Sequence, residues 1–168
     1  MIPEIAFLRK IYIFQDLDDQ ETEAVAGILT PRFFQNQDVV LEEGDTGGIM
    51  YIIADGEVQI SKTLTMKFGQ DDYRETEKTM VRLKAEDHAV FGEMALITEE
   101  KRSASVTAVS DCTLYGISRE DFLHLAEEKP GLGFKVMLRL AELVSQRLKR
   151  TDEDVVRLTT ALSIALSK

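Results

Sequence analysis

Residues 39–60 read VVLEEGDTGGIMYIIADGEVQI, and this stretch decides the fold. Its apolar side chains recur at every second position along short runs, a period that is typical of β-strands. Turn-forming residues separate the runs at Glu43-Gly44-Asp45, at Gly47-Gly48 and at Asp55-Gly56. Many short strands at this spacing predict a small antiparallel barrel or jelly roll.

The same period continues beyond this stretch. Further β-like runs lie at residues 81–83, 106–108 and 114–117. Residues 61–80 are polar and rich in Thr, which predicts an extended, exposed hairpin that turns at residues 68–72. The predicted fold class is therefore mainly β with flanking helices: an antiparallel β jelly roll (a double-stranded β-helix) followed by a long C-terminal dimerisation helix.

Helical signals flank the β region. The first thirty residues have apolar side chains near helical spacing, and Asp18 is placed to cap a helix that Pro31 would stop. The Ser118–Asp121 segment has the S-x-x-D form of a capping box and precedes apolar residues at helical spacing. Pro130-Gly131 breaks that helix.

The last segment carries an a/d heptad pattern. A helix from about Leu132 to the end would be about 55 Å long, against about 35 Å for the diameter of the preceding body. Its far end would overhang the body, so we expect a second copy to cover the seam in a parallel two-fold homodimer. The alternative is a helix folded back on its own barrel. The seam residues alternate four and three apart: Met137, Ala141, Val144, Leu148, Thr151, Val155, Leu158, Leu162 and Ala165.

Charge divides the chain in the same way. The 168 residues hold 20 Lys and Arg against 30 Asp and Glu, a net charge of −10. Residues 1–130 carry 13 basic and 26 acidic residues (13 − 26 = −13), and residues 131–168 carry 7 and 4 (7 − 4 = +3). We therefore expect a domain over residues 1–130 and a long dimer helix over residues 131–168. The acidic balance argues against direct binding of nucleic acid.

Several further classes of protein are disfavoured. A single cysteine, Cys112, leaves no disulfide framework or Cys-based zinc site, and the first residues do not resemble a signal peptide. No stretch approaches 18 uninterrupted apolar residues, so we expect no membrane span and a cytoplasmic location. His88 and His124 stand far apart, and no motif for a nucleophile or a metal is present. We expect neither catalysis nor a bound metal.

One segment favours the binding of a ligand. Residues 91–106 read FGEMALITEEKRSASV. Gly92 permits close approach of the backbone, a helix start favours an anion, and Arg102 is a fork donor suited to phosphate. The carboxylate of Glu93 accepts hydrogen bonds from sugar hydroxyls, so the pair fits a molecule with a ribose and a phosphate. An intramolecular salt bridge between Glu93 and Arg102 explains the spacing equally well.

These residues resemble the phosphate-binding cassette of cyclic nucleotide-binding domains, whose pattern is F-G-E-x-A-L, then a few variable residues, then often P-R-x-A-[ST]. The likeness covers most of the chain. It includes Glu43-Gly44-Asp45 in place of the family's E-G-D turn, and YIIADGEV at residues 51–58 in place of its Y-x-I-x-x-G-x-V strand pair. The sequence departs from the pattern at Lys101, where a Pro is common.

The resemblance implies roles for the matching positions. Glu93 would accept the ribose 2′-hydroxyl and Arg102 would pair with the cyclic phosphate. The main-chain N–H groups near Ser103 and Ala104, with the Ser103 hydroxyl, would complete the anion site. Gly92 would hold the turn on the ribose side, and Met94, which opens the short helix, completes the cassette's predicted ligand-binding residues.

The C-terminal helix resembles that of catabolite activator-type bacterial regulators, in which a Thr-Ser pair contacts the adenine from two subunits. Thr151 matches the Thr, and Asp152 stands at the Ser position. By its spacing alone, Thr151 serves equally well as a polar residue that sets the register of the seam. Asp152 would accept from an adenine amino group or, if it points inward, repel the phosphate.

The resemblance therefore implies a sensor for a cyclic nucleotide, cyclic AMP or alternatively cyclic GMP, that signals to an unidentified protein partner through its dimer helix. We expect no DNA-binding domain after this helix and no direct binding of nucleic acid. The competing hypothesis is a ligand-independent, dimeric protein-interaction module of the same fold.

Overall fold

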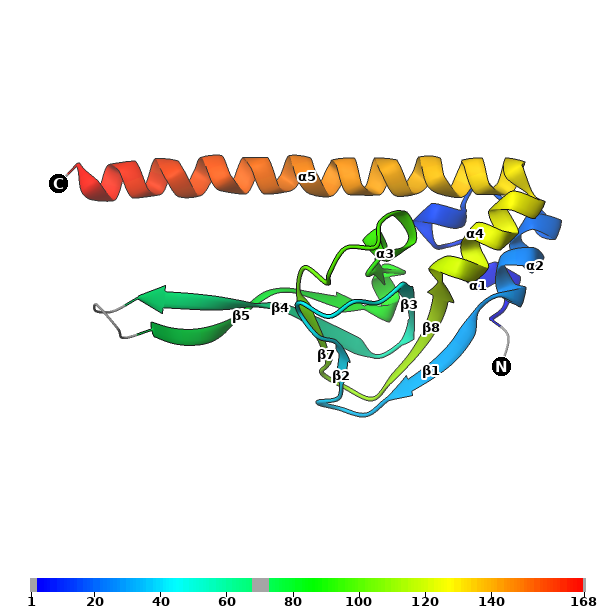
Figure 1. Ribbon diagram of the computed structural model, residues 1–168, viewed down its shortest axis with the longest axis horizontal. Helices are drawn as coiled ribbons and strands as arrows, with labels where there is room; N and C mark the ends of the chain where they lie inside the picture. The colour runs from blue at the N-terminus through cyan, green and yellow to red at the C-terminus, as the bar shows by residue number, and fades with distance from the viewer. Residues whose placement is uncertain (1–2, 68–72, 168) are drawn as a thin grey trace.

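The computed structural model describes residues 3–67 and 73–167 (Figure 1). The predicted turn at residues 68–72 lies outside the described residues. A β body carries short helices at one end, and one long helix crosses the body and continues beyond it. The long β4–β5 hairpin extends in the same direction as that helix.

Two antiparallel four-stranded sheets form the body, as predicted for a jelly roll. The first has the order β1-β8-β3-β6 and the second the order β2-β7-β4-β5. Their strands are β1 (Thr30–Phe34), β2 (Val39–Leu41), β3 (Ile49–Asp55), β4 (Glu57–Lys67), β5 (Tyr73–Lys84), β6 (Val90–Phe91), β7 (Ser105–Ala108) and β8 (Cys112–Ser118).

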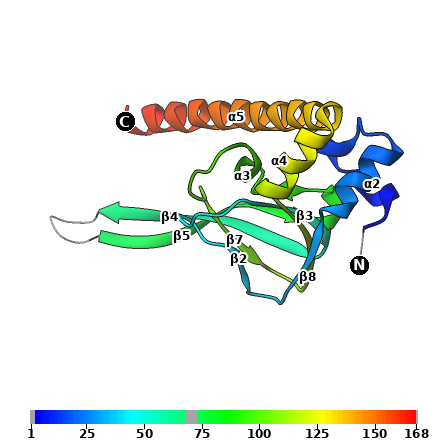
Figure 2. The same ribbon diagram turned by 45° about the vertical axis from the view of Figure 1, so that its right-hand side comes forward.

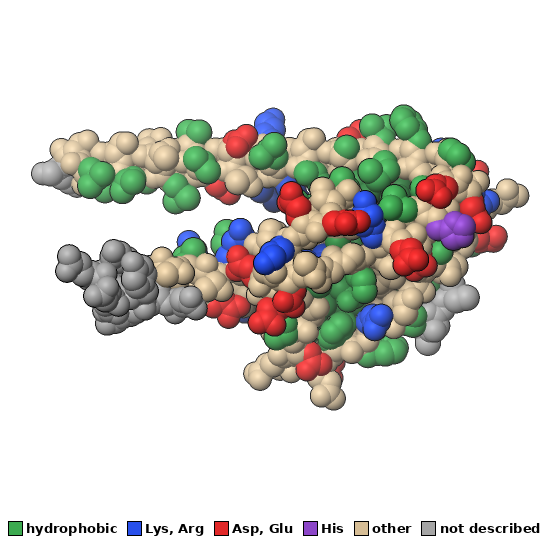
Figure 3. All heavy atoms as spheres, viewed as in Figure 1, with side chains coloured by type: hydrophobic (Ala, Val, Ile, Leu, Met, Phe, Trp, Pro, Cys, Tyr) green, Lys and Arg blue, Asp and Glu red, His purple; other side chains and the backbone are tan. Residues whose placement is uncertain are grey.

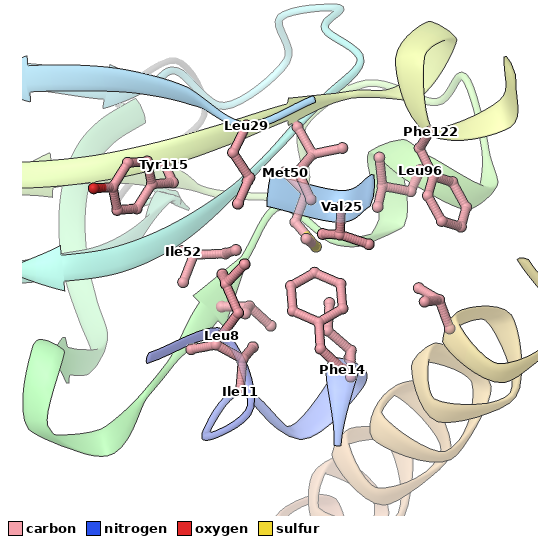
Figure 4. Packing of buried hydrophobic residues seen from close by; sticks show 14 of the residues in the cluster. Leu8, Ile11, Phe14, Val25, Leu29, Met50, Ile52, Leu96, Tyr115 and Phe122 are labelled. Atoms are coloured by element: carbon pink, nitrogen blue, oxygen red, sulfur yellow. The ribbon is translucent and has the colours of Figure 1, made fainter. Parts of the chain in front are cut away.

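The central strand β3 is buried on both faces, which explains its continuous apolar run. Met50 and Ile52 belong to the cluster that packs against the helices, whereas Tyr51 and Ile53 belong to the cluster between the two sheets. Figure 4 shows the first cluster, where Phe14 from the N-terminal helices lies close to side chains from the sheet. Successive residues thus serve two cores.

The predicted hairpin is present. Strands β4 and β5 pair antiparallel along their whole described length, with an irregularity between Ile60 and Ser61. Because β5 is the last strand of its sheet, its outer edge is unpaired among the described residues.

The N-terminal region forms α1 (Ile5–Leu8), a 3-10 turn at Tyr12–Phe14 and α2 (Asp19–Gly27). Asp18 caps α2 in a capping box with Glu21, as its position predicts. The prediction that Pro31 stops this helix was wrong. The helix ends at Gly27, and Pro31 lies inside β1, opposite Tyr115 of β8. Proline is tolerated there because β1 is an edge strand.

Three helices follow or interrupt the strands: α3 (Met94–Ile97), α4 (Arg119–Glu128) and α5 (Pro130–Leu166). The helix α5 begins at Pro130 rather than near Leu132, since proline suits the first turn of a helix. Its first turns bury Val136 and Leu140, and from Ser145 onward every described residue is exposed. Figure 2 shows the distal part of α5 extending beyond the body. None of the described helices is long and apolar enough to cross a membrane.

Candidate functional site

The cassette begins with a glycine that the backbone requires. Gly92 follows β6 with a φ of +70°, in the left-handed region. A Cβ at this position would lie 3.0 Å from Arg102 Nη1 and 3.2 Å from the carbonyl oxygen of Ile49. The bend that Gly92 allows places Glu93 directly before α3.

Arg102 holds its guanidinium in a cradle of carbonyl groups. Nη2 donates to the oxygen of Ile49 at 2.8 Å, and Nη1 donates to the oxygen of Gly92 at 3.4 Å. Partial burial lowers the pKa of Arg102, and no described carboxylate forms an ion pair with it. The hypothesis of a salt bridge between Glu93 and Arg102 is therefore wrong. A half-buried cation without a counter-ion attracts an anion.

The E-G-D turn fixes the backbone of Arg102. The N–H of Gly44 donates to the oxygen of Arg102 at 2.9 Å, and the N–H of Arg102 donates to the oxygen of Asp45 at 2.8 Å. The N–H of Glu43 donates to Ser105 Oγ. The carboxylate of Glu43 accepts from the N–H of Thr63. The turn thus positions the cassette by main-chain bonds.

Glu93 pairs with a residue that the sequence did not indicate. Its side chain is 7% exposed, and Oε1 accepts from Arg147 Nη1 of α5 at 2.5 Å. Nη2 of Arg147 donates to the oxygen of Val90 at 3.0 Å. Glu93 Oε2 makes no hydrogen bond to any described residue. One oxygen of a buried carboxylate therefore remains able to accept from a ligand.

A single cavity collects the cassette residues. Six of the eight predicted residues line it: Gly92, Glu93, Met94, Arg102, Ser103 and Ala104. The apolar part of the wall comes from the inner faces of the strands, at Leu41, Ile60, Phe91 and Val106, and the remaining lining residues are Ala95, Thr98, Glu100, Lys101 and Arg147. The arrangement joins a cation, a carboxylate and an apolar wall.

Thr151 and Asp152 do not line this cavity. Both lie on the exposed half of α5, and Thr151 Oγ1 donates to the backbone oxygen of Arg147. Arg147 stands one turn earlier on the helix and reaches the site instead. Within one chain, α5 contributes a single residue to the cavity.

Among the described residues, neither histidine belongs to a metal site. His124 is exposed, and His88 has a left-handed φ of 49° with no hydrogen bond to its Nδ1. Across residues 3–67 and 73–167, no group of three His, Cys, Asp or Glu residues is placed to hold a metal ion.

Comparison with known proteins places this geometry in a family. The family model described as "Cyclic nucleotide-binding domain" matches residues 31–129. The cyclic AMP receptor protein of Thermus thermophilus is 31% identical over 140 residues, which cover 83% of this chain and 58% of that protein. The cAMP-dependent protein kinase regulatory subunit of Dictyostelium discoideum is 32% identical over 119 residues, covering 71% and 34%.

A solved structure of the same family has a similar fold. A cyclic nucleotide-binding domain from Methylobacillus flagellatus superposes with a TM-score of 0.74 at 26% identity, covering 90% of this chain and 80% of that one. The chain spans less than two thirds of the length of each of the two relatives above. The family match, the antiparallel body and the cassette agree, and the chain belongs to the family of cyclic nucleotide-binding domains.

Proposed function

We propose that this chain is a regulatory sensor, not a catalyst, that binds cyclic AMP in the cassette cavity and acts as a homodimer. The observation that carries the proposal is the pair of unlike groups facing one cavity. The half-buried Arg102 cation forms no ion pair with a described carboxylate, and Oε2 of the buried Glu93 accepts from no described residue. A ribose phosphate presents the two complementary groups, an anion and neighbouring hydroxyls.

Different residues of the cavity bind the phosphate and the ribose of the ligand in this proposal. The phosphate is placed at Arg102, with the N–H groups near Ser103 and Ala104 and the Ser103 hydroxyl. A ribose hydroxyl donates to Glu93. Because the domain is acidic over residues 1–130, its long-range field repels an anion, so Arg102 and the local amides act at short range.

The purine is placed at α5. Thr151 and Asp152 are exposed in one chain, and a second copy along the seam brings its own helix toward each cavity. A carboxylate at position 152 accepts from an amino group, which suits adenine. Two relatives are named for cyclic AMP and three others are cGMP-dependent protein kinases, so the preference for adenine rests on position 152.

The signal is proposed to leave through α5. Arg147 bonds Glu93, so a ligand that engages Glu93 changes the environment of a residue on the dimer helix. Binding would shift the population of α5 positions that a protein partner contacts.

Titration calorimetry of the purified chain with cyclic AMP and cyclic GMP tests the proposal. We expect saturable binding with preference for cyclic AMP, and at least about a hundredfold loss in Arg102→Gln, because the substitution removes a charge-assisted contact of about 3 kcal/mol. Lys10→Gln is the matched control, since Lys10 is an exposed cation that does not line the cavity, and it should leave the affinity unchanged.

Absence of heat with either nucleotide at high micromolar concentration would contradict the proposal, as would unchanged binding in Arg102→Gln. A dimer by light scattering that binds neither nucleotide would instead support the ligand-independent interaction module.

A further inference from the structure

A second concave surface, the α4 cleft, lies between α4 and the loop that follows α3. Figures 1 and 2 show α3 next to α4 on the side of the body that faces α5. We propose that this cleft docks a basic segment of a protein partner and that docking is coupled to the nucleotide cavity. The cleft is lined by Gly48, Ile49, Glu99, Ser118, Arg119, Glu120, Leu123, His124 and Glu127.

One wall of the α4 cleft is a single face of α4. Glu120, Leu123 and Glu127 are spaced three and four residues apart, so their side chains lie on the same side of the helix. Both glutamates are exposed, and neither forms an ion pair with a described Lys, Arg or His. Leu123 is partly buried against the core and, with Ile49 of β3, gives the cleft an apolar floor.

The other wall comes from the cassette loop. Glu99 projects from this loop with its side chain 81% exposed, and its Oε1 accepts from Arg119 Nη1 at 3.0 Å. The Nε of Arg119 is buried and has no hydrogen-bond partner among the described residues. The cleft therefore combines three carboxylates, one arginine with an unsatisfied N–H group and an apolar floor.

A basic segment with an apolar side chain complements this surface. Its cations pair with Glu120 and Glu127, and its apolar side chain covers Leu123. A main-chain oxygen of the segment can accept from Arg119 Nε, a donor whose burial without a partner costs free energy. Figure 3 shows acidic side chains gathered over the body below α5, so the surrounding field also attracts a cationic partner.

The turn at residues 47–49 connects the α4 cleft with the nucleotide cavity. Arg102 Nη2 donates to the oxygen of Ile49 at 2.8 Å, and the N–H of Arg119 donates to the oxygen of Gly48 at 2.6 Å. A Cβ at Gly47 would lie 3.2 Å from Arg102 Nη2, and a Cβ at Gly48 would lie 3.3 Å from the Cβ of Arg119. Two adjacent glycines thus allow one turn to contact both arginines closely.

The cassette loop provides a second connection. Glu99 lines the cleft, whereas the next residue, Glu100, lines the nucleotide cavity. A cation of the partner that draws Glu99 away from Arg119 changes the loop that carries Arg102. Docking and nucleotide binding should therefore change each other's affinity by the same factor. The docking stands without a nucleotide, and the coupling rests on the proposed function.

Fluorescence anisotropy with a labelled Lys-Leu-Lys-Leu-Lys peptide tests the docking on the full chain without nucleotide. We expect saturable binding that weakens about tenfold in the double variant Glu120→Gln and Glu127→Gln, because two ion pairs are lost. The matched control, Glu23→Gln with Glu86→Gln, removes the same two charges from exposed positions outside the cleft and should change the affinity less than twofold.

Three outcomes would overturn the docking. They are no saturable binding of the basic peptide up to millimolar concentration, an equal loss in both double variants, and equal binding of a Glu-Leu-Glu-Leu-Glu peptide.

The same titration with saturating cyclic AMP tests the coupling. We expect the dissociation constant of the peptide to change at least about threefold, and Arg119→Gln to remove this change while the variant still binds the nucleotide. Cyclic AMP that binds and leaves the peptide affinity unchanged overturns the coupling alone. A chain that binds no cyclic nucleotide overturns the proposed function and the coupling, whereas the docking is judged by the titration without nucleotide.

Discussion

Glu93 is a buried charge with a counter-ion from a distant element. Its side chain is 7% exposed, whereas that of Arg147 is 45% exposed. A buried carboxylate without a partner costs several kcal/mol, so Arg147 stabilises the cassette even without a ligand. The pair also fixes the carboxylate, because Arg147 holds Oε1 and the backbone oxygen of Val90 together.

Loss of Arg147 should therefore destabilise the fold. We expect Arg147→Met to lower the free energy of unfolding by about 1–2 kcal/mol, less than for a fully buried pair because the arginine is partly in water. Urea denaturation measures the change. The double variant with Glu93→Gln should recover part of the loss, since no charge then remains buried. An effect no larger than that of Arg150→Met, an exposed neighbour, would contradict this account.

At the residue scale, the sequence predicted the site residues that lie close to one another along the chain. The cassette lies within residues 91–106, so its motif alone brought Gly92, Glu93 and Arg102 into consideration. Arg147 follows Glu93 by 54 residues and meets it only through the packing of α5. Arg147 lies one heptad after Leu140 on the same side of the helix, and this spacing was the signal in the sequence from which Arg147 could have been found. The carbonyl partners of Arg102 are main-chain groups, on which side-chain patterns carry no information.

At the scale of elements, polar contacts fix α5 to the N-terminal helices. The guanidinium of Arg139 donates to both carboxylate oxygens of Asp16, at 2.7 and 2.9 Å, and lies over the ring of Tyr12. Lys135 Nζ donates to Glu21 at 2.7 Å. The hydrogen bond from Arg139 lowers the pKa of Asp16, and the bond to Glu21 raises the pKa of Lys135. The proximal half of α5 is thus anchored while the distal half is free for other contacts.

This anchor should depend on pH. Because the pKa of Asp16 is lowered in the folded state, its carboxylate stabilises the fold above the unfolded pKa of about 3.9, and the stabilisation is lost as the pH falls through the folded value. We expect Asp16→Asn to lower the Tm at pH 7 and the difference from the native chain to vanish in strong acid. Thermal unfolding from pH 7 to pH 2 measures it. Asp55→Asn, an exposed aspartate on β3, serves as control, and an equal effect there would contradict the proposed anchor.

Elements with strong local signals were predicted well. Asp18 caps α2 because its carboxylate satisfies a free N–H of the first turn, which needs only neighbouring residues. The strand β1 was missed. Its exposure does not alternate, and among the described strands only β8 pairs with it, so long-range pairing rather than local pattern defines it.

At the scale of the molecule, α5 exposes an apolar seam far from its own body. Leu148, Val155, Leu158 and Leu162 are each more than half exposed. The structure also shows Phe134, 69% exposed, three residues before Met137, which extends the seam by one position toward the body. A second copy is the simplest cover for such a seam, since it offers the same residues in register.

Disrupting the centre of this seam should separate the copies. We expect Leu158→Lys to raise the dissociation constant of the dimer at least tenfold, because a charge replaces an apolar group at a seam position. Light scattering across a dilution series measures the change. Thr160→Lys places the same charge on the helix face away from the seam and should leave the mass unchanged. Equal masses for both variants would count against the seam as the interface.

The helix α5 carries both Arg147, at the cavity, and the seam, along which the second copy is proposed to bind. Two equilibria that share one rigid element are linked, and thermodynamic linkage is reciprocal: any factor by which the second copy tightens the nucleotide is the factor by which the nucleotide tightens the dimer. The concentration of nucleotide that half-saturates such a sensor therefore depends on its own abundance. Diluting the protein would shift its response threshold without any change to the pocket.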